Sequence, residues 1–252
     1  MTPEAPLASR AAAGDKRSSS FTRLFSVFSS PGATFSELAR DPHFILCWCV
    51  QVVVSLLVGF TMLHRVGVYA LARQALAQRG ATQALSGVQL QHALAAAAIG
   101  MRFTYYLAPI GTIVVSLIMA GIFLGLVNFV LGYEANYKQS VAVVSYAYLV
   151  QTLYWLLTIV VLWLMANPAS VTFTNPIGTN LGFFLDKNAT SPFLYALATH
   201  MDVFAIWTVI LLGIGLSKLG GKKGKVSAAL GGVVVLWLLY IFVSSGVVAL
   251  FA

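Results

Sequence analysis

The sequence predicts an all-α integral membrane protein with five transmembrane helices, preceded by short amphipathic helices at the membrane interface. Three observations lead to this fold class: of the 252 residues 59% are hydrophobic, only 9% are charged, and the mean hydropathy is +0.87. A soluble domain usually carries about 25% charged residues, so a soluble fold of this length could not cover its surface. We expect lipid around most of the chain, where a helix pairs its own backbone N–H and C=O groups.

An amphipathic pattern covers residues 21–42, which follow a polar tail. Residues 1–20 are small and polar and have no hydrophobic period, so they are expected to form a disordered cytoplasmic tail. The next stretch predicts an interfacial helix, because apolar residues recur at helical spacing with Arg23 on the opposite face. These apolar residues are Phe21, Leu24, Phe25 and Phe28.

Proline and capping residues divide this segment into two short helices. Ser30 is expected to cap a second helix that has Pro31 at its first position. Thr34 is an alternative start, because an acidic residue follows it at capping-box spacing. Asp41 and Pro42 repeat the cap-and-proline pattern just before the first long apolar run. We therefore expect that pair to start the first spanning helix.

Five apolar runs are each long enough to cross about 30 Å of hydrocarbon, which takes about 20 helical residues. They belong to a membrane domain expected over residues 43–252, and the runs are 44–63, 104–131, 141–165, 196–217 and 227–251. Residues 64–102 contain several glutamines and an alanine-rich stretch that gains little from transfer into lipid. We interpret them as helical extensions outside the membrane, with a sixth span as the alternative.

The distribution of lysine and arginine predicts the orientation, because cytoplasmic loops carry an excess of both. With the N-terminus in the cytoplasm, ten positive residues fall on that side: Arg10, Lys16, Arg17, Arg23, Arg40, Lys138, Lys218, Lys222, Lys223 and Lys225. Five fall on the other side: Arg65, Arg73, Arg79, Arg102 and Lys187. The excess predicts a cytoplasmic N-terminus and a C-terminus outside.

The polar octapeptide GYEANYKQ interrupts the apolar sequence between the second and third runs. Gly132 is expected to end the second helix. Tyr133 and Tyr137 suit the headgroup region, where an aromatic ring can be half wet. Glu134 and Lys138 stand at i and i+4 and would pair if the turn were helical there. The octapeptide therefore predicts a tight helical hairpin on the cytoplasmic side.

Two stretches resemble bacterial members of the Yip1 domain family: FSSPGATFSELARDP, residues 28–42, and GYEANYKQSVAVVSYAYL, residues 132–149. The second stretch contains a glycine-led loop that runs into Lys138, followed by an apolar segment with Tyr146. The resemblance extends over the spans and implies five transmembrane helices, a cytoplasmic N-terminus and a bacterial inner membrane. Eukaryotic members are linked to vesicle trafficking and small GTPases, but the Asp-Leu-x-Gly-Pro motif of their tails is absent here.

A basic loop, LSKLGGKKGKVS, connects the fourth and fifth runs. It lacks the G-x-x-x-x-G-K-[ST] spacing and the preceding strand of a phosphate-binding loop. Basic residues near a membrane surface each gain about 1 kcal/mol from anionic lipid. We therefore expect four lysines to contact anionic headgroups: Lys218, Lys222, Lys223 and Lys225. The net charge of +8 has the same explanation, since no nucleic-acid-binding module is recognisable.

Asp202 is the carboxylate that lies deepest in an apolar run, and His200 precedes it by two residues. Ionisable groups inside a membrane are costly and are therefore functional candidates. At this spacing the two side chains point apart on a helix, which makes a poor metal site. We expect Asp202 to act as an interfacial helix cap or to pair with Arg102 or Lys187, with proton or cation handling as the alternative.

Two pairs of small residues at a spacing of four predict close helix packing. They are Gly121 with Gly125 in the second run, and Ala228 with Gly232 in the fifth. Packing within the chain is expected, and self-association is the alternative.

No motif for catalysis, a cofactor or a metal is recognisable, including H-E-x-x-H, G-x-S-x-G and a Rossmann glycine pattern. The sequence therefore predicts a non-enzymatic protein that organises or scaffolds a membrane through contacts with lipids, and with a membrane-protein partner or itself. The alternative is a small transporter or channel subunit that uses Asp202 and His200.

Overall fold

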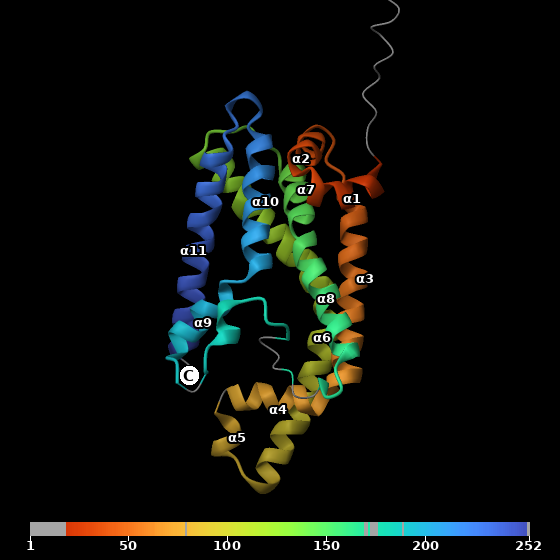
Figure 1. Ribbon diagram of the computed structural model, residues 1–252, viewed down its shortest axis with the longest axis vertical. Helices are drawn as coiled ribbons and strands as arrows, with labels where there is room; N and C mark the ends of the chain where they lie inside the picture. The colour runs from red at the N-terminus through yellow and green to blue at the C-terminus, as the bar shows by residue number, and fades with distance from the viewer. Residues whose placement is uncertain (1–18, 79, 169–170, 172–175, 188, 251–252) are drawn as a thin grey trace, which may run out of the picture.

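The part of the chain described by the computed structural model is helical, apart from its loops and one isolated bridge between Asn180 and Asp202 (Figure 1). The described residues are 19–78, 80–168, 171, 176–187 and 189–250. The predicted tail therefore lies outside the described residues, except for its last two positions.

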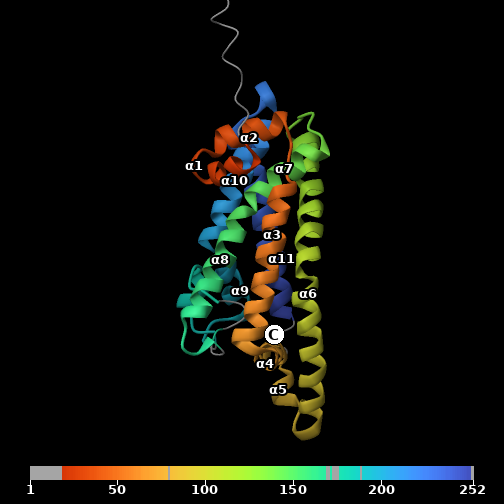
Figure 2. The same ribbon diagram turned by 90° about the vertical axis from the view of Figure 1, so that its right-hand side faces the viewer.

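The helices in chain order are α1 (Ser20–Ser29), α2 (Pro31–Arg40), α3 (Ile45–Thr61), α4 (Val68–Gln78), α5 (Ala81–Ala84), α6 (Gly87–Gly125), α7 (Tyr137–Ala147), α8 (Leu149–Leu164), α9 (Pro192–His200), α10 (Val203–Leu219) and α11 (Val226–Leu250). The π-helical segments η2 (Met62–Gly67) and η3 (Leu126–Val130) continue α3 and α6. Two 3-10 turns are η5 (Leu181–Phe184) and η6 (Gly221–Lys223). The long helices form a bundle, with α1 and α2 across one end and α4 and α5 at the other (Figures 1 and 2).

Four helical stretches of the described chain are long and apolar enough to cross a membrane: Ile45–Gln78, Gly87–Val130, Tyr137–Leu164 and Val226–Leu250. They cover all but one terminal residue of each of the first, second, third and fifth predicted runs. The fourth predicted run is not one helix, because α9 ends at His200 and the shorter apolar helix α10 begins at Val203. The break arises because the carboxylate of Asp202 caps the start of α10.

Gly67 ends the straight part of the first stretch. Its φ is +92°, a backbone conformation that glycine adopts without the steric penalty of a Cβ atom. After this residue, α4 runs across the end of the bundle and leads through α5 to α6 (Figure 1). The extensions predicted between the first two runs are therefore helical.

The stretch formed by α6 and η3 has 44 residues, and its length of about 66 Å is more than twice the hydrocarbon thickness of about 30 Å.

Tyr148 separates α7 from α8 within the third candidate span. One turn before it, the carbonyl of Ser145 accepts a hydrogen bond of 2.8 Å from Gln51 Nε2 on α3. Trp48 Nε1 donates to the Ser145 hydroxyl at 2.9 Å. Water is absent from the hydrocarbon region, so polar groups exposed by a helix break there need partners from the protein. The two side chains of α3 provide them.

The main core lies toward the end of the bundle where α2, α7 and α10 meet. Phe35, Val143 and Tyr146 are fully buried in it. Gly215 on α10 makes this packing close, because a Cβ atom there would lie 2.5 Å from Val143 Cγ1 and 3.0 Å from the Phe35 ring.

Of the four small residues predicted to pack helices together, Gly232 does so. A Cβ atom on it would lie 2.8 Å from the side chain of Leu126. Ala228 is exposed, nothing lies within 4 Å of a Cβ built on Gly121, and Gly125 meets only the nearby Phe129 ring at 3.9 Å. The prediction that the G-x-x-x-G pair packs within the chain is therefore wrong, because α6 turns that face away from the other helices.

Replacing Gly215 with alanine tests the close packing of the core. We expect Gly215→Ala to lower the free energy of unfolding by about 1–3 kcal/mol, since the methyl group overlaps buried atoms that cannot all move aside. Thermal unfolding in detergent measures the change. Gly231→Ala on α11 is the matched control, because nothing lies within 4 Å of its Cβ position. Equal unfolding temperatures for the two variants would contradict the packing.

Candidate lipid-contact site at one end of the bundle

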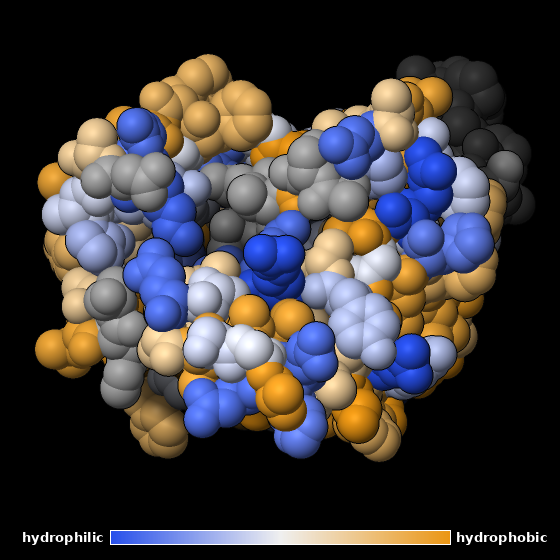
Figure 3. All heavy atoms as spheres, turned by 90° about the horizontal axis from the view of Figure 1, so that it is seen from below, coloured by the Kyte–Doolittle hydropathy of each residue, from blue (hydrophilic) through white to orange (hydrophobic). Residues whose placement is uncertain are grey.

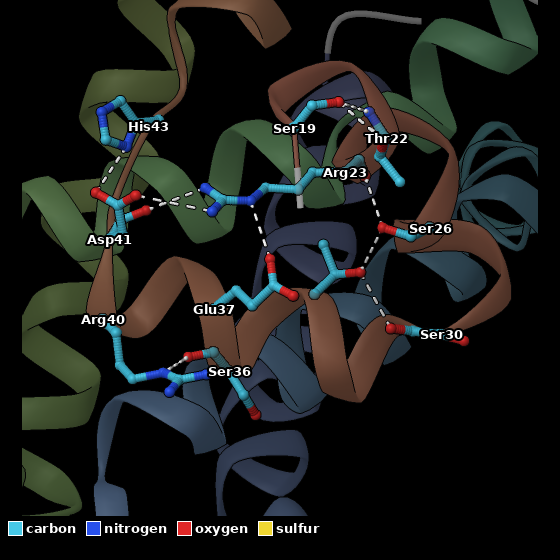
Figure 4. Close-up of polar contacts among 11 residues, drawn as sticks. Ser19, Thr22, Arg23, Ser26, Ser30, Ser36, Glu37, Arg40, Asp41 and His43 are labelled. Atoms are coloured by element: carbon cyan, nitrogen blue, oxygen red, sulfur yellow. Dashed lines mark hydrogen bonds and ion pairs between the residues drawn. The ribbon is translucent and has the colours of Figure 1, made fainter. Parts of the chain in front are cut away.

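A buried arginine joins the first two helices to the start of α3. Arg23 on α1 is only 3% exposed. Its Nε donates to Glu37 Oε2 on α2 at 3.1 Å, and its Nη2 lies 3.7 Å from Asp41 Oδ2 (Figure 4). Nη1 also donates to the Asp41 main-chain carbonyl at 3.4 Å. A guanidinium offers five donors in a fixed plane, so it can hold several acceptors at once.

This arrangement corrects the predicted orientation of α1. Arg23 was expected on the solvent face, but α1 turns it inward together with Leu24 and Val27. Phe21 and Phe25 are instead 64% and 63% exposed, and their rings pack edge to face with centroids 5.3 Å apart. The two phenylalanines therefore form an outward apolar pair.

The predicted start of α2 is correct, and the predicted start of the first span is wrong. α2 begins at Pro31 with Ser30 as its N-cap, although the Ser30 side chain makes no capping hydrogen bond. The alternative start, Thr34, lies inside the helix. Asp41 ends α2 and does not cap α3, which begins at Ile45. The carboxylate of Asp41 binds Arg23 instead, which explains its position.

The polar octapeptide at residues 132–139, which we call the hinge, connects the second and third predicted spans. It begins as an extended loop and leads into α7, whose start is capped. Gly132 has φ +67° and follows the end of η3. Asn136 caps α7, and its side chain and that of Gln139 form a reciprocal capping box. Glu134 precedes α7 and Lys138 lies within it, so the two do not share a helix. The described residues show no ion pair between them.

Tyr133 was expected at a half-wet position, but it is buried against the basic loop. It is 6% exposed, and its hydroxyl accepts a hydrogen bond from the backbone N–H of Lys225 at 3.3 Å. A Cβ on Gly220 would lie 2.7 Å from the Tyr133 ring. Tyr137 is exposed and donates its hydroxyl to the Leu117 carbonyl at 2.8 Å. Tyr146 lies deeper, in the main core.

The four predicted lysines lie in or next to the basic loop, which packs on Tyr133. Lys222, Lys223 and Lys225 are exposed, and Lys218 is half-buried at the end of α10. A cavity of about 560 Å³ lies between this loop, the end of α2 and the start of α7. Its lining includes Arg40 and Lys218.

On the side of the cavity formed by α2 and α7, Gln139 links the two helices, because its Nε2 donates to the Ala39 carbonyl at 2.6 Å. The hinge, α2 and the basic loop therefore meet at one end of the molecule. Arginine and lysine in such an open cavity are suited to an anionic oxygen ligand such as a phosphate group.

Asp202 and His200 do not form a common site. Asp202 Oδ1 accepts from the N–H groups of Phe204 at 2.7 Å and Ala205 at 3.3 Å. Its Oδ2 accepts a hydrogen bond from the Thr179 hydroxyl. His200 Nε2 lies 2.9 Å from Ser244 Oγ on α11. Asp202 is thus a helix cap, one of the two roles expected from its position, and His200 fastens α9 to α11.

Within the described ranges, no three histidine, cysteine, aspartate or glutamate residues lie close enough to hold a metal ion together.

The features above define an all-helical, multi-pass membrane protein with a basic surface at one end. Residues 25–245 match the family model for the Yip1 domain. The chain therefore belongs to the Yip1 domain family. Comparison with curated proteins and with solved structures gave no match.

Removing the buried guanidinium tests whether Arg23 fixes the N-terminal helices. We expect Arg23→Met to lower the free energy of unfolding by about 1–3 kcal/mol, because the partly exposed carboxylates of Glu37 and Asp41 lose their shared cation and hydrogen-bond donor. Arg73→Met, at an exposed position on α4, is the control and should change stability little. Unfolding in detergent gives both values, and a loss below about 1 kcal/mol for Arg23→Met would show that the ion pairs are dispensable.

Proposed function

We propose that this protein is a non-enzymatic, membrane-organising component of a bacterial inner membrane, and that its basic end binds anionic lipid headgroups. In this proposal residues 1–20 are a cytoplasmic tail, residues 21–42 lie along the membrane interface, and residues 43–252 form a membrane domain with five spans. The observation that carries the proposal is the cavity beside the basic loop, where Arg40 and Lys218 face a space large enough for a headgroup.

The fifth span in this proposal is α10. Its 17 residues extend about 25 Å at 1.5 Å per residue, slightly less than the hydrocarbon thickness. α10 packs along α11, and both begin or end at the basic loop (Figure 1). Counting α10 as a span places α1, α2, the hinge and the basic loop on one side of the membrane. α4, α5 and the end of α11 then lie on the other side.

The charges support a cytoplasmic position for the end with the basic loop. Seven described lysines and arginines belong to that end: Arg23, Arg40, Lys138, Lys218, Lys222, Lys223 and Lys225. The opposite end, seen in Figure 3, mixes hydrophilic and hydrophobic residues. It holds four: Arg65, Arg73, Arg102 and Lys187. Positive residues stay preferentially on the cytoplasmic side during insertion.

Cysteine labelling tests the topology. In a chain whose Cys47 and Cys49 are replaced by alanine, we expect Lys222→Cys to react with a membrane-impermeant maleimide only when the cytoplasmic face is accessible. Gln83→Cys on α5 should react only from the other face. Labelling is measured in intact cells and in inverted vesicles. Three proposed spans separate the two positions, so reaction of both cysteines from one side would show that α10 does not cross the membrane.

The proposed headgroup site combines charge with a fixed shape. The hydrogen bond from Gln139 to Ala39 joins two of its walls, and the one from Lys225 to Tyr133 fixes the basic loop to the hinge beside it. Gly224 is required within the loop, because a Cβ there would lie 1.9 Å from the Ser217 carbonyl oxygen. The backbone of a loop held in this way needs no further ordering when a headgroup binds, which lowers the entropic cost of binding.

Thermal stabilisation by added lipid tests headgroup binding. We expect short-chain phosphatidylglycerol to raise the unfolding temperature in neutral detergent more than short-chain phosphatidylcholine does, since a ligand that binds the folded state stabilises it. The double variant Arg40→Gln/Lys218→Gln should lose most of that difference. Arg73→Gln/Lys187→Gln removes the same charges from the other end and should retain it. If the two double variants respond alike, the cavity is not the site.

Transport through Asp202 and His200 receives no support from their contacts. Both carboxylate oxygens of Asp202 already accept hydrogen bonds, from Thr179 and from the start of α10. The imidazole of His200 is directed to Ser244. We therefore assign both residues a role in holding the break between α9 and α10.

A further inference from the structure

The cavity beside the basic loop contains two positive side chains that no acidic residue of its lining neutralises. Arg40 borders it at the end of α2, and Lys218 borders it at the end of α10. None of the described residues that line the cavity is an aspartate or a glutamate. The nearby carboxylates of Glu37 and Asp41 bind Arg23 instead. A ligand in this cavity therefore meets two cations and no competing anion from its walls.

The uncharged hydroxyl groups of the lining have no hydrogen to offer such a ligand. The hydroxyls of Ser36 and Ser217 each donate to a carbonyl of their own helix at 2.7 Å. Arg40 Nε donates to the Ser36 carbonyl at 3.4 Å, which keeps the guanidinium beside the cavity (Figure 4). An ammonium has three donors and a guanidinium has five, and neither accepts a hydrogen bond. Lys218 and Arg40 thus require a ligand group that is rich in acceptor oxygens.

A phosphomonoester fits two cations better than a phosphodiester does. Its second pKa is near 6, so at pH 7 it has a charge of about −1.5 to −2, spread over three acceptor oxygens. A phosphodiester, such as that of phosphatidylglycerol, has lost one of these oxygens and one of these charges to its second ester bond. Only the monoester can balance the charges of both Arg40 and Lys218.

We propose that this cavity selects a phosphomonoester group over a phosphodiester, and that Arg40 and Lys218 bind its terminal oxygens. Phosphatidic acid presents this group at a membrane surface, and small phosphate esters present it in solution. The inference rests on the proposed headgroup site and specifies the chemical class of its ligand.

Thermal unfolding of the full chain in neutral detergent at pH 7.5 measures the preference. Short-chain phosphatidic acid is compared with short-chain phosphatidylglycerol that has the same acyl chains. We expect phosphatidic acid to reach half of its maximal stabilisation at a concentration about fivefold lower, the difference expected for one added charge beside a basic residue. Equal concentrations would overturn the inference. The proposed headgroup site would survive that result if both lipids still stabilised the chain more than phosphatidylcholine does.

Glycerol 3-phosphate distinguishes the two sources of the group, because it has the same phosphomonoester and no acyl chain. Stabilisation by phosphatidic acid at concentrations where glycerol 3-phosphate has no effect would support selection of a lipid. Equal stabilisation by both would support selection of the monoester and would overturn the proposed role of a lipid headgroup.

Lys218→Gln removes one of the two charges and should reduce the preference for phosphatidic acid from about fivefold to less than about twofold. Lys138→Gln is the matched control, because Lys138 is an exposed lysine at the same end and does not line the cavity. Lys218 also lies in the last turn of α10, where a positive charge favours the helix. The ratio between the two lipids is therefore the readout, since a purely structural role changes stability without changing this ratio. A retained fivefold preference in Lys218→Gln would overturn the inference.

The pH dependence of the preference is an independent readout. Between pH 7.5 and pH 5.5 a phosphomonoester gains a proton and loses its second charge, whereas a phosphodiester keeps its single charge. Lysine and arginine side chains stay charged over this range. We therefore expect the preference for phosphatidic acid to fall below about twofold at pH 5.5, and an unchanged preference would overturn the inference.

Other titratable groups at this end of the molecule act on both lipids alike, so the ratio between the lipids removes their contribution. These groups are Glu37, Asp41, His43 and Glu134.

Discussion

The ion pairs of Arg23 determine how the N-terminal helices sit on the membrane domain. Its guanidinium is enclosed between α1, α2 and the segment that leads to α3, and it binds Glu37 and Asp41. A buried cation with two acidic partners is not itself a large source of stability, but the group is very costly to leave unpaired. The pairs therefore select one arrangement of α1 and α2. That arrangement places Phe35 in the main core and Arg40 at the border of the basic cavity.

Hydrophobic patterning predicted much of the fold, because helix length and apolar content are local properties. The two short N-terminal helices, the reversal at Gly132 and the grouping of the lysines in one loop are all visible in consecutive residues. Arg23 could not be placed in this way, since its partners lie 14 and 18 positions further along the chain and a helical wheel does not show what covers a face. The same limit explains the G-x-x-x-G pair, whose spacing is correct for packing although no helix faces Gly121.

Two further features carried sequence signals that were open to a different interpretation. Asp202 within an apolar run was a sign that the run is divided, because aspartate is a strong N-cap residue. Gln51 stands in an otherwise apolar helix, and a polar side chain there usually has a partner in another helix. In the structure, Asp202 caps α10, and Gln51 donates to the Ser145 carbonyl beside the break between α7 and α8. Their partners could not be identified without the tertiary arrangement.

The hydrogen bond between Gln51 and Ser145 has a consequence for how the protein enters the bilayer. The two residues are 94 positions apart, so at about 5–20 residues per second the ribosome needs about 5–20 seconds to reach the acceptor after making the donor. During that interval a lone first helix in lipid would carry an amide with no partner, which is unfavourable. The first helix is therefore better retained beside the insertion machinery until the third arrives, and the two would then partition into lipid as a pair.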